Sequence, residues 1–110
     1  MTYLRRSSRY ELRFPIHLDS PSKRDRVGVV RNVSETGVLI GTPSRFTKGQ
    51  RIRLKFRTKA DGPHVEIAGT VVRTGFDPGG EWLGRLVAVH FDRAVALRRI
   101  HELKSAYAFW

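Results

Sequence analysis

Short apolar runs bounded by turn-forming residues make up most of this chain. From Leu12 onward they are rich in Val, Ile, Leu and Phe, and clusters of Gly, Pro, Asp and Ser separate them. This pattern is typical of successive antiparallel strands. It predicts six strands, at residues 12–18, 26–33, 38–42, 51–57, 65–74 and 85–91.

The segment 51–57 alternates strictly between basic and apolar residues. In a strand, such alternation turns one face toward the core and the other toward water. We therefore expect a half-buried strand whose four cations form a solvated outer face.

Turn signals support the strand count. Asp61-Gly62-Pro63 and Asp77-Pro78-Gly79-Gly80 each separate two apolar runs, as hairpin loops do. Six short strands leave two open edges unless the sheet closes on itself. The expected fold is mainly β, a six-stranded antiparallel barrel.

The apolar period changes after Phe91. Ala96, Ile100, Leu103, Tyr107 and Trp110 recur at steps of four and three, which places them on one helical stripe. We expect a C-terminal helix over 92–110, with Asp92 accepting hydrogen bonds from the first turn. Its large aromatic side chains would pack on the barrel or on a second copy in a dimer, and the sequence leaves both open.

Length and composition indicate one folded domain over residues 1–110. The expected elements divide it into an arm (1–11), a barrel (12–91) and the helix (92–110). Of the 110 residues, 40% are hydrophobic and 28% are charged, a balance that favours a folded chain. There are no cysteines, which excludes disulfides and thiolate metal sites. With no apolar run long enough to span a membrane, we expect a cytoplasmic protein.

Basic residues outnumber acidic residues by 21 to 10, and the net charge is +11. Such a field attracts anions, phosphate-bearing ones above all. Three arginines, Arg5, Arg6 and Arg9, lie in the flexible N-terminal arm before the first expected strand. The arginine fork can pair with phosphate oxygens or with the O6 and N7 atoms of guanine.

A second polar element joins two apolar runs, at residues 31–38. Asn32 and Ser34 have short side chains that can bond nearby backbone or reach a ligand, and Gly37 provides backbone freedom where a Cβ would clash. By itself the element predicts a hairpin turn.

Together the two elements resemble the PilZ domain family, whose signature is Arg-x-x-x-Arg followed by Asp/Asn-x-Ser-x-x-Gly. Arg5 and Arg9 match the first part, and Asn32, Ser34 and Gly37 match the second. Pro15 and the ending at 87–91 before a helix are also similar, so the resemblance covers nearly the whole chain.

The resemblance implies a split barrel that binds cyclic di-GMP, a bacterial second messenger, without any other cofactor or metal. The residues it implies as ligand contacts are Arg5, Arg6, Arg9, Asn32, Ser34 and Gly37. Binding would close the arm over the ligand and change the surface offered to an unknown downstream protein in motility, exopolysaccharide or virulence control. Leu4, just before the first motif arginine, favours one bound ligand molecule over two.

Three other interpretations stay open. A small basic nucleic-acid-binding barrel of the OB type would suit the charge and size, but the phenylalanines are scattered rather than clustered along adjacent strands. A PilZ-type protein-interaction adaptor would lack the motif residues found here. An enzyme is disfavoured, because His17, His64, His90 and His101 lie on separate elements without a nucleophile or metal-ligand spacing.

Overall fold

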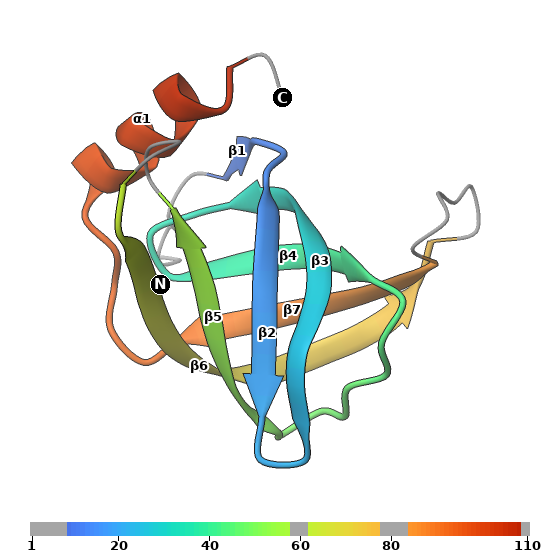
Figure 1. Ribbon diagram of the computed structural model, residues 1–110. Helices are drawn as coiled ribbons and strands as arrows, with labels where there is room; N and C mark the ends of the chain where they lie inside the picture. The colour runs from blue at the N-terminus through green and yellow to red at the C-terminus, as the bar shows by residue number, and fades with distance from the viewer. Residues whose placement is uncertain (1–8, 58–61, 78–83, 109–110) are drawn as a thin grey trace, which may run out of the picture.

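The computed structural model describes residues 9–57, 62–77 and 84–108. Seven strands and one helix lie in these ranges (Figure 1). The strands are β1 (Tyr10–Glu11), β2 (Pro15–Ser20), β3 (Lys23–Val33), β4 (Gly37–Thr42), β5 (Arg51–Arg57), β6 (His64–Phe76) and β7 (Arg85–Phe91), and the helix is α1 (Leu97–Ala106).

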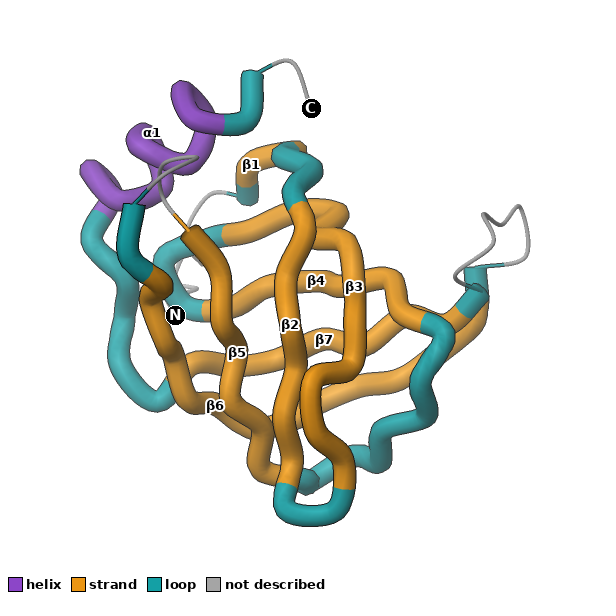
Figure 2. The backbone as a smooth tube through the Cα atoms, viewed as in Figure 1, coloured by secondary structure: helices purple, strands orange, loops and turns teal. Residues whose placement is uncertain are grey.

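Strands β2 to β7 close into the expected six-stranded antiparallel barrel (Figure 2). The hydrogen-bonded order is β3-β2-β5-β6-β7-β4, and β4 pairs back onto β3. Arg57 pairs with His64, and Phe76 pairs with Arg85, so β5–β6 and β6–β7 are hairpins as predicted.

The first strand differs from its prediction. Residues 12–14 are not in a strand, the barrel strand begins at Pro15, and part of the expected arm, residues 10–11, forms the extra strand β1 on β3. Leu12 and Phe14 are nevertheless buried, and the Phe14 carbonyl accepts a hydrogen bond from Val30 N at 2.9 Å. An apolar pattern indicates which residues are buried, and residues can be buried without belonging to a hydrogen-bonded strand.

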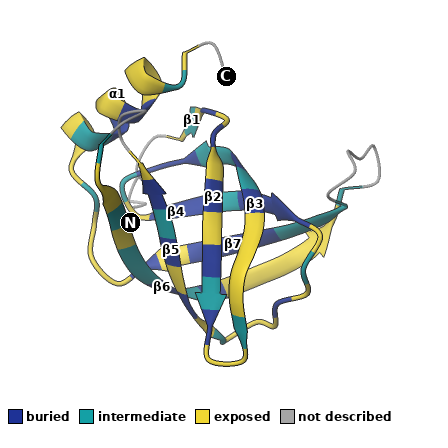
Figure 3. Cartoon of the chain, viewed as in Figure 1, coloured by how far each residue is buried: buried dark blue, intermediate teal, exposed yellow. Residues whose placement is uncertain are grey.

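Alternation along the strands builds the core, and Figure 3 shows the resulting bands of buried and exposed residues. In β5 the apolar residues are buried and the basic residues between them point outward. Completely burying a large apolar side chain contributes about 1.5–3 kcal/mol, so this core accounts for most of the driving force. Among the most buried side chains are Phe14, Leu18, Ile40, Leu54, Val71, Val89, Ile100 and Leu103.

The helix is shorter than predicted. It begins at Leu97, and its N-cap residue is Ala96, which makes no side-chain capping bond. The expectation that Asp92 caps the helix is therefore wrong, because both Asp92 carboxylate oxygens accept hydrogen bonds from Arg51 instead. An arginine fork offers a carboxylate two parallel charged hydrogen bonds, which a helix end five residues away does not.

The apolar stripe of α1 packs on its own barrel. Ile100 and Leu103 are buried, and the Tyr107 ring stacks on Phe14 with 5.2 Å between ring centroids. The Tyr107 hydroxyl also donates a hydrogen bond to the Arg57 carbonyl at 2.9 Å. Trp110 lies outside the described residues. Within the described part of the chain, no helix is long and apolar enough to cross a membrane.

Candidate ligand-binding site

The turn between β3 and β4 is built by Ser34. Its side chain is buried, and its Oγ accepts hydrogen bonds from the backbone N–H groups of Thr36 and Gly37, both at 3.2 Å. The Ser34 N–H donates to the Gly37 carbonyl at 2.8 Å. A short hydroxyl side chain can satisfy turn amides in this way. Ser34 therefore holds the turn in its shape from the buried side.

Gly37 is required by the packing of strands. A Cβ at this position would lie 2.7 Å from the carbonyl oxygen of Val89 in β7. Because that oxygen belongs to the backbone, it cannot move away cheaply. The glycine thus lets β4 approach β7 closely at the point where the turn meets the barrel.

Arg9 and Asn32 bring the two sequence motifs together. Tyr10 pairs with Val33, and Glu11 pairs with Asn32, so β1 runs along the end of β3. This pairing places Arg9 beside the turn, where its Nη1 donates a 2.8 Å hydrogen bond to Asn32 Oδ1. Arg9 is exposed and Asn32 is half-buried, so both side chains are accessible from solvent.

Of the six predicted site residues, Arg9, Asn32, Ser34 and Gly37 are described, and these four lie around one turn. Arg5 and Arg6 lie outside the described residues, as does Leu4. The roles of all six toward a ligand stay predictions.

The turn is also bonded to the last residue of β7 and to the segment that leads into α1. Phe91 N donates to the Thr36 carbonyl at 2.9 Å, and Val95 N donates to the Glu35 carbonyl at 2.7 Å. Sequence reasoning missed these contacts, because backbone carbonyls carry no residue-specific signal.

Tyr10 makes a second connection from the arginine motif to the helix. Its ring meets His101 of α1 edge-on, with centroids 6.4 Å apart. Its position directly after Arg9 is the signal in the sequence that could indicate this contact.

Three of the four outward cations of β5 form ion pairs with acids, whereas Arg57 donates a hydrogen bond to the Gly62 carbonyl. Arg51 pairs with Asp92 through two hydrogen bonds, which lower the pKa of Asp92 below its ordinary value. Lys55 lies 2.9 Å from Asp19 and 3.1 Å from Asp25. The pKa of Asp19 is lowered, first by the hydrogen bond from Asp25 N and then by Lys55.

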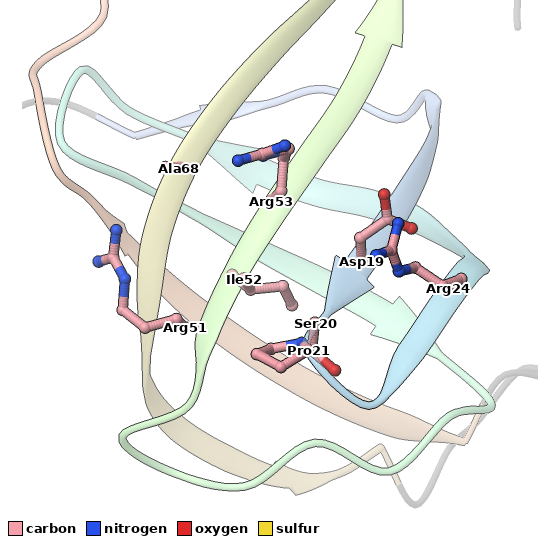
Figure 4. Close-up of a pocket in the computed structure, with 8 residues that line it drawn as sticks. All are labelled: Asp19, Ser20, Pro21, Arg24, Arg51, Ile52, Arg53 and Ala68. Atoms are coloured by element: carbon pink, nitrogen blue, oxygen red, sulfur yellow. The ribbon is translucent and has the colours of Figure 1, made fainter.

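A hollow of about 270 Å³ lies beside these ion pairs, and Arg51, Arg53, Asp19 and Arg24 are among its lining residues (Figure 4). Three of its charged residues, Arg51, Arg53 and Asp19, already have partners of opposite sign. These partners offset part of the charge that an added anion would meet. Among the described residues, no group of three acids or histidines could hold a metal ion.

A family model described as PilZ domain matches residues 3–107. The chain belongs to the PilZ domain family. PilZ domains are binding and adaptor domains rather than catalysts, and the family is associated with cyclic di-GMP. No curated protein matches the sequence.

Two solved structures have the same fold. The Bacillus subtilis inhibitor of motility (MotI/DgrA) aligns with a TM-score of 0.66 and 17% identity, over 96% of this chain and 50% of that one. This PilZ chain thus spans half of that protein. The PilZ domain of CeSA from a cellulose synthesizing bacterium aligns with a TM-score of 0.59 and 11% identity, over 93% of this chain and 97% of that one.

Proposed function

We propose that this chain is a non-catalytic receptor for cyclic di-GMP. The observation that carries the proposal is the hydrogen bond from Arg9 to Asn32, which joins the arginine motif and the turn motif at one accessible surface. Membership of the PilZ family supports the choice of ligand.

The donors left at this surface suit a guanine dinucleotide. A guanidinium has five N–H donors, and only one Arg9 donor is used in the bond to Asn32. The remaining donors can pair with phosphate oxygens or with guanine O6 and N7. Because Asn32 Oδ1 accepts from Arg9, its amide NH₂ group is oriented and can donate to the ligand.

Arg5 and Arg6 would close over the ligand from the other side, and one guanidinium plane would stack on a base. Ser34 and Gly37 would hold the turn in shape, with Ser34 adding a contact if its hydroxyl turns outward. Fixing a backbone residue around a ligand costs about 1–2 kcal/mol, which the charged hydrogen bonds must exceed.

Binding would be sensed by α1. The Glu35 carbonyl accepts a hydrogen bond from Val95, just before the helix, the Thr36 carbonyl accepts one from Phe91, and Tyr10 contacts His101. A shift of the arm or the turn would therefore strain contacts that lead to the helix. The output that we propose is control of motility, exopolysaccharide production or virulence through a partner protein.

Calorimetric titration with cyclic di-GMP tests the proposal, with separate titrations of GTP, cyclic di-AMP and single-stranded DNA for comparison. Arg9→Ala should weaken binding by about tenfold or more, because a charged hydrogen bond contributes roughly 1.5–3 kcal/mol. Arg13→Ala removes the same charge from an exposed position nearby and is the matched control. A folded protein that gives no selective heat with cyclic di-GMP would refute the receptor function.

A further inference from the structure

The end of the β6–β7 hairpin has an unpaired strand edge. Strand β5 pairs with β6 only as far as Arg51 and Thr70, and Val71 is then bonded by Gly49 and Gln50. On that side, no strand of the described chain pairs with residues 72–76, although β7 continues to pair with their other edge. All five residues are exposed. Unpaired backbone groups of this kind accept an added strand.

A hollow of about 640 Å³ is lined by the last three residues of this edge, Thr74 to Phe76. One wall is formed by residues 74–76 of β6 together with residues 85–87 of β7, and the other by the segment 44–48 that follows β4. In Figure 1 that segment leaves the barrel beside the paired ends of β6 and β7, at the opposite end of β4 from the Asn32–Gly37 turn. The hollow is therefore separate from the nucleotide site.

The loop wall is held in a defined shape. Gly49 has a φ of +91°, and its N–H donates to the Val71 carbonyl at 2.7 Å. The Gln50 side chain accepts from Thr47 N at 3.0 Å. Lys23 bonds the Arg45 carbonyl and lies over the Phe46 ring at 5.4 Å. Because this wall is already held in one shape, a partner can bind to it without the entropy cost of ordering the loop.

Apolar surface and positive charge meet at this hollow. Phe76 is 70% exposed, and the Arg85 guanidinium lies 5.3 Å from its ring centroid. Arg45, Lys48 and Arg85 line the hollow, no lining residue is acidic, and none of these three cations has an acid within 4.0 Å among the described residues. This differs from the outer face of β5, where Arg51, Arg53 and Lys55 form ion pairs with acids.

We propose that this edge and hollow dock an extended, acidic segment of a partner protein, which adds a strand to β6. Its carboxylates would pair with Arg45, Lys48 and Arg85, and an apolar side chain would cover Phe76. A second copy of this chain is disfavoured, because two faces of the same positive charge would meet and the chain carries +11 overall.

The surface is connected to the nucleotide site. Arg31, the neighbour of Asn32, lies at a bulge in β3 and forms a 2.6 Å ion pair with Asp77, the neighbour of Phe76. The docking surface thereby gives the proposed receptor a partner-binding face. Its test omits cyclic di-GMP, so failure of one proposal leaves the other standing.

The probe is a synthetic peptide in which glutamate alternates with valine, titrated into ¹⁵N-labelled protein and followed by NMR shifts and amide exchange. Its glutamine counterpart is the control peptide. We expect shifts at 44–48 and 73–76, slower exchange of amides at 72–76, and at least tenfold weaker binding of the glutamine peptide. Phe76→Ala should also weaken binding roughly tenfold, as loss of an apolar anchor does.

Two double variants, each of which reverses two positive charges, distinguish binding at this hollow from general attraction of the acidic peptide to a basic protein. Arg45→Glu with Lys48→Glu should abolish binding, whereas Arg24→Glu with Arg53→Glu changes the net charge equally at exposed positions elsewhere and should weaken it less than threefold. Equal losses in the two pairs would overturn the proposal, as would shifts confined to other surfaces. Tighter binding of single-stranded DNA to the same amides would assign the hollow to nucleic acid instead.

Discussion

Two residues of the turn motif act on structure before any ligand arrives. The Ser34 hydroxyl accepts from two turn amides, and Gly37 permits β4 to lie against the Val89 carbonyl. Asn32 is different, because its side chain is accessible and meets Arg9. The motif thus combines turn-forming residues with a ligand-facing residue, and substitutions should separate the two roles.

Gly37→Ala should lower the free energy of unfolding by about 1–3 kcal/mol, because the new Cβ overlaps a backbone carbonyl that must shift. Gly75→Ala is the matched control, since a Cβ there meets nothing within 4 Å, and its effect should stay within about 0.5 kcal/mol. Urea denaturation measures both. Equal stabilities of the two variants would show that β4 and β7 are not held this closely.

Ser34→Ala and Asn32→Ala should differ in the property they damage. The first leaves the Thr36 and Gly37 amides without their side-chain acceptor and should cost about 1–3 kcal/mol of stability. The second should leave stability within about 1 kcal/mol while weakening cyclic di-GMP binding. Thermal unfolding and calorimetry on both variants check this. A Ser34→Ala protein of unchanged stability that fails to bind would make Ser34 a direct ligand contact.

At the scale of elements, the basic face of β5 joins parts of the barrel that are distant in sequence. Arg51 ties β5 to the segment after β7, where Asp92 N also donates to the Ala68 carbonyl of β6 at 2.9 Å. Lys55 ties β5 to β2 and to the β2–β3 hairpin through Asp19 and Asp25. These cations therefore act within the fold.

The Arg51–Asp92 pair should make stability depend on pH. Because the pKa of folded Asp92 lies below its ordinary value of 3.8, the pair stabilises the protein above that value, and the stabilisation is lost as pH falls through the folded pKa. Wild type should exceed Asp92→Asn in urea midpoint at neutral pH, and the difference should vanish in acid. Asp19 titrates in both proteins and cancels. A gap that persists in strong acid would mean that packing, rather than charge, is responsible.

For the whole molecule, the net charge of +11 should speed the arrival of an anionic ligand. Arg24→Glu with Arg53→Glu removes four units of charge at exposed positions away from the Asn32–Gly37 turn. Stopped-flow measurements should show a slower association of cyclic di-GMP, by about twofold to tenfold at low salt, and an unchanged dissociation rate. A faster dissociation would indicate that these arginines touch the ligand.

The strand pattern was predictable because burial and strand period coincide. Strands at 51–57 and 85–91 match their predictions, since the first alternates through its whole length and the second has a continuous apolar run at 86–89. The ends of other elements were not predictable. Aspartate is a residue type that commonly caps helices, yet Asp92 pairs with Arg51, 41 residues earlier in the chain. A local pattern contains no information about such a distant partner.

The amino-acid sequence by itself determined the six-stranded barrel, the apolar stripe of the helix and the family motif, because periodicity and spacing are local properties of the chain. Only the tertiary structure decided that Arg9 meets Asn32, that Ser34 points inward and that β6 ends with an unpaired edge. These features depend on which strands become neighbours and where each pairing stops. That is set by the closure of the whole barrel.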